Sequence, residues 1–591
     1  MLDMLIRNGD VVDGTGAPRR KADVGIKDGR IVSISNGDIS GGDISSNGSS
    51  GTAEEASQVI DATGKIVAPG FVDIHTHYDA QAFWDPTLSP SPLHGVTTVI
   101  GGNCGFTIAP LGLDSSTKNP ADGEYLMRML ARVEGMPLEP LRDGVPWDWT
   151  TYGEFLDRMD GTLSINAGFM VGHSAIRRVV MGEESTQREA TPEEMTELKR
   201  LLRDGIEAGG LGFSSSWART HNDADGAMVP SRYASRDELV ALAGVCRDFE
   251  GTSLELIPCV GPFEDWALNL MADMSAAAGR QLNWNVMLVN SANYDDCVEK
   301  LHAGDVAREK GGKVVALTVP VNLGVRLCFA SGFGLDALPE WETHMFGSKA
   351  EKIAMLSDPD RRRHLDELAQ QPSPLRGLAD WQSKVIYDTV SPQNEQYRGR
   401  LVAEIAEEEG KSPWDALCDI AVADELQTSF GTPAARESDD DWKARVDVIR
   451  DSRAVIGASD AGAHLDFLAS FNYSTYLLGR GVREAGALGL EEAIQLMTDE
   501  QAQLYGISKR GRLEEGWHAD VIVFDEATVD SEEIRMNYDV PGGSGRLFAK
   551  AVGMDHVVCN GEEIVRNGEF TQARPGTVLR SGTHTYTPDI N

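Results

Sequence analysis

Hydrophobic and polar side chains alternate in the manner of β-strands near both ends of the chain. Residues 4–35 hold two such runs, with turn sequences at Asn8-Gly9 and Asp28-Gly29. Asn-Gly and Asp-Gly favour tight hairpin turns because these residues tolerate positive φ angles. Residues 519–525 form another apolar run, and Asn560-Gly561 is a further turn sequence. The pattern predicts β-rich segments at both termini, joined in one small composite domain.

Between these ends the pattern changes to short β-branched runs separated by helical stretches. Residues 191–208 have helical spacing, and Thr191-Pro192-Glu193-Glu194 is typical of a helix N-terminus. Repeated strand–helix units indicate an α/β fold with a parallel barrel, in which active-site groups lie at the carboxyl ends of strands. The expected strands are 65–74, 96–100, 165–173, 210–216, 252–260, 282–289, 314–321 and 454–459.

The predicted domain organisation follows from these changes of pattern. Residues 1–66 and 501–591 are expected to build the β-rich domain, and residues 67–500 the barrel. Two inserts, near 111–160 and 325–450, are longer than ordinary connections and are predicted to be lids or substrate walls, or else packing or oligomer contacts. Residues 36–57, rich in Gly, Ser and Asp, are expected to form a flexible surface insertion.

Composition and charge exclude several classes of function. The 591 residues contain 54 Lys and Arg against 92 Asp and Glu, a formal net charge of −38. Such a balance argues against nucleic acid or an anionic membrane as a partner. No apolar run approaches the roughly 20 residues of a membrane helix, and the start of the chain does not resemble a signal peptide. The seven cysteines are scattered, so we expect no disulfide framework and a cytoplasmic location.

The strongest chemical signal is a pair of histidines at the end of an apolar strand. His75 and His77 follow the run 65–74. Side chains two residues apart in a strand point to the same side, so both imidazoles face one site. Neutral imidazole nitrogens suit zinc and similar divalent ions. The alternative is an ordinary pair of polar residues leaving a strand.

Several motifs together resemble the amidohydrolase superfamily, in particular its N-acyl-D-amino-acid deacylase (D-aminoacylase) branch. The resemblance implies a distorted (β/α)₈ TIM barrel with a β-sandwich built from both termini, a divalent metal, a small-molecule amide substrate and a homo-oligomer. The motifs occur in the order of the family and span nearly the whole chain, at residues 68–77, 95–99, 102–105, 171–173, 458–464 and 516–523.

The resemblance also implies roles for individual residues. His75 and His77 match the metal ligands of the first strand. Cys104 matches a metal-coordinating cysteine, and a thiolate is a strong zinc ligand; a small buried residue in a Gly-rich turn is the alternative. Asp460 matches the essential aspartate, which contacts the metal and moves a proton during catalysis.

Substrate-binding candidates follow the third, fourth and sixth strands. His173 is predicted to bind substrate or polarise its carbonyl, or else to be a structural histidine. Arg219 is a candidate clamp for a substrate carboxylate, because its planar guanidinium matches that group. His221 is a candidate for substrate or metal, and Asn285 for substrate. Exposed loop residues are the alternative for Arg219 and His221.

The chain departs from the D-aminoacylase pattern at two places. That branch has metal-binding histidines on the fifth and sixth strands, whereas this chain has Glu255 and Asn285 there. Asparagine is a poor zinc ligand beside histidine or thiolate, so one ion, zinc for preference, is expected rather than two. Glu255 is predicted to be a further ligand, a general base or an interior carboxylate.

The leading functional hypothesis is a metal-dependent hydrolase that cleaves the amide C–N bond of a small molecule, with N-acyl-D-amino acids as the nearest substrate class. An alternative is hydrolysis of cyclic amides or imides, as in hydantoinases and dihydropyrimidinases, because fold alone does not choose substrate. A second alternative is a catalytically silent scaffold, which the replaced histidines suggest.

Overall fold

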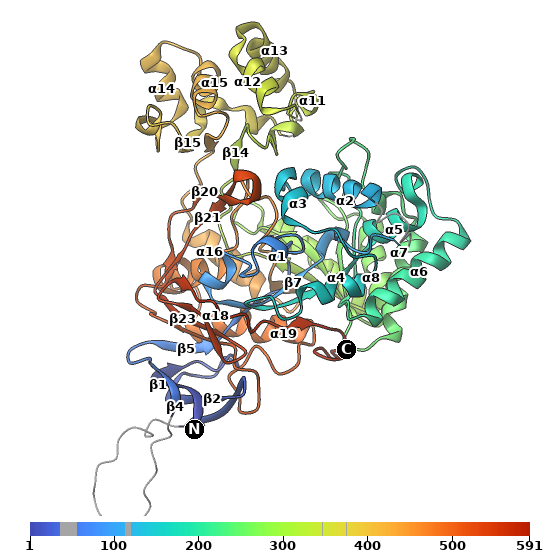
Figure 1. Ribbon diagram of the computed structural model, residues 1–591, viewed down its shortest axis with the longest axis vertical. Helices are drawn as coiled ribbons and strands as arrows, with labels where there is room; N and C mark the ends of the chain where they lie inside the picture. The colour runs from blue at the N-terminus through green and yellow to red at the C-terminus, as the bar shows by residue number, and fades with distance from the viewer. Residues whose placement is uncertain (36–55, 113–119, 346, 374, 591) are drawn as a thin grey trace, which may run out of the picture.

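The computed structural model describes residues 1–35, 56–112, 120–345, 347–373 and 375–590. A large body carries a smaller helical unit at one end (Figure 1). The insertion expected at 36–57 lies outside the described residues except for Ala56 and Ser57, which begin a strand. None of the helices in the described part of the chain is long and apolar enough to cross a membrane.

The two ends of the chain share one nine-stranded sheet. Strand β5 of the N-terminal part pairs antiparallel with β18 of the C-terminal part, with Pro69 opposite Val521. The predicted pairing of the two β-rich ends is therefore present, while the β-sandwich stays a prediction. The strands are β1 Leu2–Val11, β2 Arg20–Lys27, β3 Arg30–Ser35, β4 Ala56–Asp61, β5 Ile66–Pro69, β18 Val521–Phe524, β23 Met554–Cys559, β24 Glu562–Arg566 and β25 Glu569–Phe570.

One of the three predicted hairpin turns in this sheet is wrong. Asp28 and Asn560 have positive φ angles of 50° and 46° and connect paired strands, as expected. Asn8, with φ 64°, instead lies inside β1, where the pairing with β2 shifts register between Ile6 and Gly9. Asp23 accepts a hydrogen bond from the backbone N–H of Asn8 at 2.7 Å. The positive φ therefore produces a β-bulge, and the strand continues beyond it.

The middle of the chain forms two parallel sheets, which confirms the α/β class. One has the order β6-β7-β8-β26 and the other β9-β10-β11-β12-β13-β17. Only Met170 separates β8 from β9, and Thr76 forms a parallel bridge with Ala461. The closed barrel stays a prediction. The strands are β6 Phe71–Asp73, β7 Val96–Gly101, β8 Asn166–Phe169, β9 Val171–Gly172, β10 Gly212–Ser216, β11 Ser253–Ile257, β12 Gln281–Met287, β13 Lys313–Thr318, β17 Ala454–Ile456 and β26 Val578–Leu579.

Amphipathic helices cover these sheets. The helix expected at 191–208 is α6, and Thr191 caps its N-terminus in a capping box with Glu194. Strands β10 and β11 are buried along their whole length, as is usual when helices cover a parallel sheet. The covering helices are α5 His173–Met181, α6 Pro192–Glu207, α7 Arg236–Ala243, α8 Asp265–Ala278, α10 His302–Glu309, α16 Asp439–Ile449 and α18 Leu490–Leu496.

The two inserts differ in how they pack. The first contributes α2 Pro120–Val133, α3 Leu138–Gly144 and α4 Tyr152–Met159 to the main hydrophobic core. The second forms the unit at the top of Figure 1, with its own core around Trp341, Trp381 and Trp414. This unit contains α11 Glu342–Met345, α12 Lys349–Ser357, α13 Pro359–Ala369, α14 Val402–Glu409, α15 Pro413–Ala423 and a small sheet of β14 Arg326–Cys328, β15 Val385–Asp388 and β16 Ser429–Gly431.

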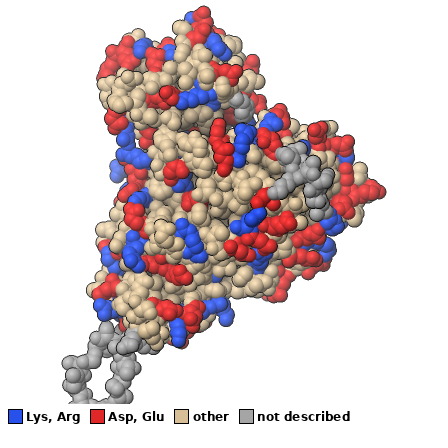
Figure 2. Space-filling model, viewed as in Figure 1, with Lys and Arg blue, Asp and Glu red and all other residues tan. Residues whose placement is uncertain are grey.

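Acidic and basic side chains are interspersed over the face of the molecule seen in Figure 2. The excess of acidic residues in the sequence is thus spread among basic ones there, and this face presents no extended basic field of the kind that binds nucleic acid.

Candidate metal centre

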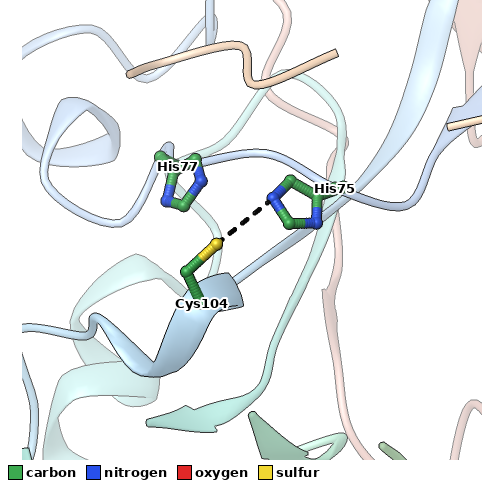
Figure 3. A group of neighbouring side chains, drawn as sticks. All are labelled: His75, His77 and Cys104. Carbon is green, nitrogen blue, oxygen red and sulfur yellow. Dashed lines mark hydrogen bonds between the residues drawn. The ribbon is translucent and has the colours of Figure 1, made fainter. Parts of the chain in front are cut away.

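Three potential metal ligands meet at the carboxyl ends of β6 and β7 (Figure 3). His75 and His77 follow β6 and are buried, with ring centroids 5.3 Å apart. Cys104 follows β7, and its Sγ lies 3.7 Å from His75 Nε2. Ligand atoms of the three residues all lie within 4.8 Å of one another. The two histidines therefore lie together, as the strand periodicity predicted, and Cys104 lies beside them; binding of a metal by this group stays a prediction.

Asp460 brings a carboxylate to the same place from the end of β17. Its Oδ1 lies 3.1 Å from His75 Nε2 and 3.6 Å from His77 Nε2. The Asp460 side chain is 22% exposed, whereas those of His75 and His77 are 0% and 3% exposed. Burial opposes ionisation of Asp460, but hydrogen bonds to the two histidines hold its pKa well below the usual range. An accessible, ionised carboxylate beside the ligands suits proton transfer.

The donor set fits a divalent ion of the zinc type. Two imidazoles, a thiol and a carboxylate are the groups that proteins use for zinc. Burial, followed by the nearby Glu255, raises the pKa of Cys104 well above its ordinary value. Burial likewise lowers the pKa of His75, and its Nδ1 is buried without a hydrogen-bond partner among the described residues. A cation held here would displace the thiol proton and could be bound by His75 Nε2, which faces Cys104 Sγ and Asp460 Oδ1.

Comparison with known proteins identifies the family. The sequence profile described as Amidohydrolase family matches residues 58–565. The chain belongs to the amidohydrolase family. The resemblance to the amidohydrolase superfamily and its D-aminoacylase branch is confirmed. The chain is a metal-dependent hydrolase of carbon–nitrogen bonds other than peptide bonds.

Several relatives of this amidohydrolase carry specific names. An N-acyl-D-glutamate deacylase of Alcaligenes xylosoxydans xylosoxydans is 29% identical over 98% of this chain and 96% of its own. A D-aminoacylase of the same organism is 26% identical over 98% and 97%. A solved D-aminoacylase structure with a binuclear metal centre has a TM-score of 0.63 at 25% identity, covering 98% of this chain and all of that one. An N-acyl-D-glutamate deacylase of Bordetella bronchiseptica, solved with zinc and a phosphonate inhibitor, has a TM-score of 0.62 at 25% identity with the same coverage.

The amidohydrolase has a carboxylate beside the candidate ligands that the sequence did not reveal. Glu134, which follows α2 in the first insert, places Oε1 3.4 Å from His77 Nδ1. Burial raises the pKa of Glu134 to about 7, although the nearby His77 opposes this rise. Burial alone would lower the pKa of His77, but the carboxylates of Glu134 and Asp460 raise it to about 9. No motif marks Glu134, because its position depends on how the insert folds back over the strand ends.

Two aspartates in and after β6 form hydrogen bonds with the turns that precede Cys104 and Asp460. Asp79 Oδ2 accepts a hydrogen bond from the Gly102 N–H at 3.0 Å, and burial raises the pKa of Asp79 to about 6. Asp73 accepts a hydrogen bond from the Ser459 hydroxyl, next to Asp460. Burial raises the pKa of Asp73 to about 7. These contacts link the turn after β7 and the end of β17 to the histidine strand.

Glu255 and Asn285 approach Cys104 from β11 and β12. Glu255 Oε2 accepts a hydrogen bond from the Cys104 backbone N–H at 2.7 Å. Asn285 Nδ2 lies 3.4 Å from both Cys104 Sγ and His75 Nε2. Of the four predicted substrate residues, Asn285 is the one with a contact to the three-residue cluster among the interactions recorded for the described chain.

The other three predicted substrate residues differ in their surroundings, and the charges of His464, His77 and Asp460 act on His221. His173 is fully buried, with Nδ1 2.8 Å from Ser215 Oγ and Nε2 2.9 Å from Glu238 Oε1. Arg219 is exposed in the loop after β10. His221 Nδ1 lies 2.7 Å from Ser216 Oγ, and burial lowers the pKa of His221 to about 3. Both ring nitrogens of His173 are therefore occupied, so the structure favours the structural alternative for that residue.

Proposed function

We propose that this amidohydrolase removes the acyl group from N-acyl-D-amino acids by hydrolysing their amide bond. The observation that carries the proposal is the convergence of His75, His77 and Cys104 within 4.8 Å, with Asp460 Oδ1 3.1 Å from His75 Nε2. The substrate class is supported by similarity to N-acyl-D-glutamate deacylase and D-aminoacylase over 98% of the chain.

We also propose that His75, His77, Cys104 and Asp460 hold one zinc ion. Glu255 and Asn285 stand where the D-aminoacylase pattern has histidines, which leaves fewer nitrogen ligands for a second ion. Glu255 Oε2 is engaged by the Cys104 N–H.

The proposed reaction needs a base and an acid, and Asp460 suits both roles in turn. A divalent ion held by these residues would polarise the amide carbonyl and make a water molecule more acidic. Asp460 accepts the proton of that water through a carboxylate oxygen as the water oxygen adds to the carbonyl carbon. It then delivers the proton to the amide nitrogen, and the C–N bond breaks to leave a carboxylic acid and an amine, which become a carboxylate and an ammonium ion when the acid proton passes to the amine.

We further propose that the strands around this site close into a distorted eight-stranded barrel. The continuity of β8 with β9 and the bridge between Thr76 and Ala461 support closure, because each of them links one of the two parallel sheets to the other. In such a barrel, catalytic groups gather at the carboxyl ends of the strands, where His75 and Cys104 are found.

We propose that the substrate enters through the cavity of about 630 Å³ between the first insert, the second insert and the hairpin of β20 Arg535–Val540 and β21 Ser544–Phe548. Phe333 lines this cavity, and its ring centroid is 5.0 Å from that of His464. Gly135 also lines it and directly follows Glu134, which contacts His77. The cavity thus lies beside the segment that contacts His77.

A substrate panel tests the proposed function. The purified full chain, loaded with zinc, is assayed with N-acetyl-D-amino acids, their L enantiomers, and cyclic imides and hydantoins. We expect hydrolysis of the D series, loss of activity with a chelator, and about one equivalent of zinc by elemental analysis. Activity confined to the rings would replace the deacylase proposal with the cyclic amide alternative. A protein that binds no zinc and hydrolyses none of these compounds would favour the scaffold alternative.

A further inference from the structure

The turn that carries Cys104 has an unusual backbone. Cys104 has a φ of 56°, between Gly102 and Gly105 with φ angles of 74° and 73°. Such angles disfavour residues with a Cβ, so Cys104 needs surrounding contacts to keep this conformation. A Cβ on Gly102 would come within 2.4 Å of the Met170 carbonyl oxygen, which shows how closely the turn is packed. The direction of the thiol therefore depends on what restrains this turn.

Two side chains, one on β10 and one on β11, restrain the turn by hydrogen bonds. Glu255 on β11 accepts the Cys104 N–H at 2.7 Å, and Ser214 on β10 accepts the Gly105 N–H at 3.1 Å. Ser214 also donates its hydroxyl hydrogen to the Gly102 carbonyl oxygen. Ser214 and Glu255 are direct partners in the parallel pairing of the two strands, so they present their side chains side by side. Both are fully buried.

We infer that Glu255 is a positioning residue that acts through Cys104, by way of the oxygen that accepts the Cys104 N–H. The inference rests on the proposed metal site and assigns a role that the residue type alone left open. Glu255 fixes the backbone of Cys104 so that Sγ points toward His75 and His77. Hydrogen bonds that orient a ligand from outside the coordination shell commonly change metal affinity by about 10- to 100-fold when removed.

Glutamine and alanine at position 255 separate this role from ligation. A glutamine carbonyl oxygen can still accept the Cys104 N–H, whereas alanine leaves that buried donor unpaired. We expect Glu255→Gln to bind zinc nearly as tightly as the wild type, and Glu255→Ala to bind it about 10- to 100-fold more weakly. Asn283→Ala is the matched control, because Asn283 is buried beside Glu255 on β12 and bonds to Leu254 and Tyr505 instead of the turn.

The test is a double-mutant cycle on the full chain. Zinc affinity is measured by competition with a chromophoric chelator in the wild type, Glu255→Ala, Cys104→Ala and the double variant. If Glu255 acts through Cys104, Glu255→Ala should cost little further affinity once the thiol is absent. Cobalt-loaded Glu255→Ala should also show a weakened thiolate-to-cobalt absorption band, while Glu255→Gln and Asn283→Ala retain it.

Three outcomes would overturn the inference. An equal loss of affinity from Glu255→Ala with and without Cys104 would make Glu255 a ligand in its own right. Glu255→Gln as weak as Glu255→Ala would show that the charge is required, and wild-type behaviour of Glu255→Ala would remove any role. If Glu255→Ala does not fold, Ser214→Ala enters the same cycle, since it releases the same turn. These outcomes are distinct from failure of the proposed function, in which the wild type itself binds no zinc.

Discussion

Glu134 Oε1 lies 3.4 Å from His77 Nδ1, so a residue of the first insert touches the candidate metal site. A carboxylate on the second nitrogen of a ligating histidine orients the ring and raises its basicity. The segment between β7 and β8 therefore supplies a side chain, Glu134, that contacts His77, a candidate ligand that follows β6. This contact gives the buried carboxyl group of Glu134 a partner.

Removing this partner should weaken metal binding without removing a ligand. We expect Glu134→Ala to lower zinc affinity by about 10- to 100-fold, because His77 loses the group that orients it. Chelator competition measures the affinity directly. Glu124→Gln, in the same insert but exposed and paired with Arg142, is the control and should bind zinc as the wild type does. Equal affinity in both variants would contradict an orienting role for Glu134.

Asp460→Asn should separate catalysis from metal binding. Asparagine preserves the shape of the side chain but cannot act as a base, so we expect kcat to fall by about 10²- to 10⁴-fold. His75, His77 and Cys104 remain, so elemental analysis should still find zinc in the variant. The kinetics are followed with whichever N-acyl-D-amino acid the wild type hydrolyses best. A variant that retains full activity would exclude Asp460 as the proton carrier.

His173 should act on stability and not on substrate. Replacing it with alanine removes hydrogen bonds to Ser215 and Glu238 in a fully buried place. We expect a loss of about 1–3 kcal/mol in the free energy of unfolding, measured in urea. KM should remain that of the wild type. A large rise in KM with unchanged stability would restore the substrate-binding role that the sequence predicted.

His94 makes stability depend on pH. It is fully buried, with Nδ1 2.7 Å from Thr475 Oγ1 and Nε2 3.1 Å from the Ala549 carbonyl oxygen. Burial lowers the pKa of His94 from 6.5 to about 4. Between these pH values the imidazole is therefore mostly protonated in the unfolded chain and mostly neutral in the folded chain. Its contribution to stability is complete above pH 6.5 and is lost as the pH falls toward 4. At about 1.4 kcal/mol per pKa unit, the full loss is about 3 kcal/mol.

Urea unfolding at pH 7.5 and pH 5 measures this effect. We expect the wild type to lose more stability between the two pH values than His94→Gln, which has no group that titrates in this range. His302→Gln is the control, because His302 is 59% exposed and its replacement should leave the pH dependence unchanged. The same pH dependence in His94→Gln and the wild type would assign the acid sensitivity to other groups.

The sequence by itself determined the features that depend on neighbouring residues. Strand periodicity predicted that His75 and His77 face the same place, and their rings lie close together. The sequence around Thr191 predicted a helix N-terminus, which is the start of α6. Both follow from local backbone geometry, which repeats every two residues in a strand and needs fixed partners at a helix end. The Asp28 turn was predicted for the same reason.

Only the tertiary structure decided which distant side chains meet. Glu134 reaches His77 because an insert folds back over the strand ends, and Glu255 reaches Cys104 because β11 packs against the turn that carries Cys104. The pairing of β1 on both sides of Asn8 made a bulge out of an expected turn. His173, predicted to bind substrate, instead contacts Glu238, which is 65 residues away in the chain. Such contacts depend on the packing of segments far apart in sequence, and no local pattern records that packing.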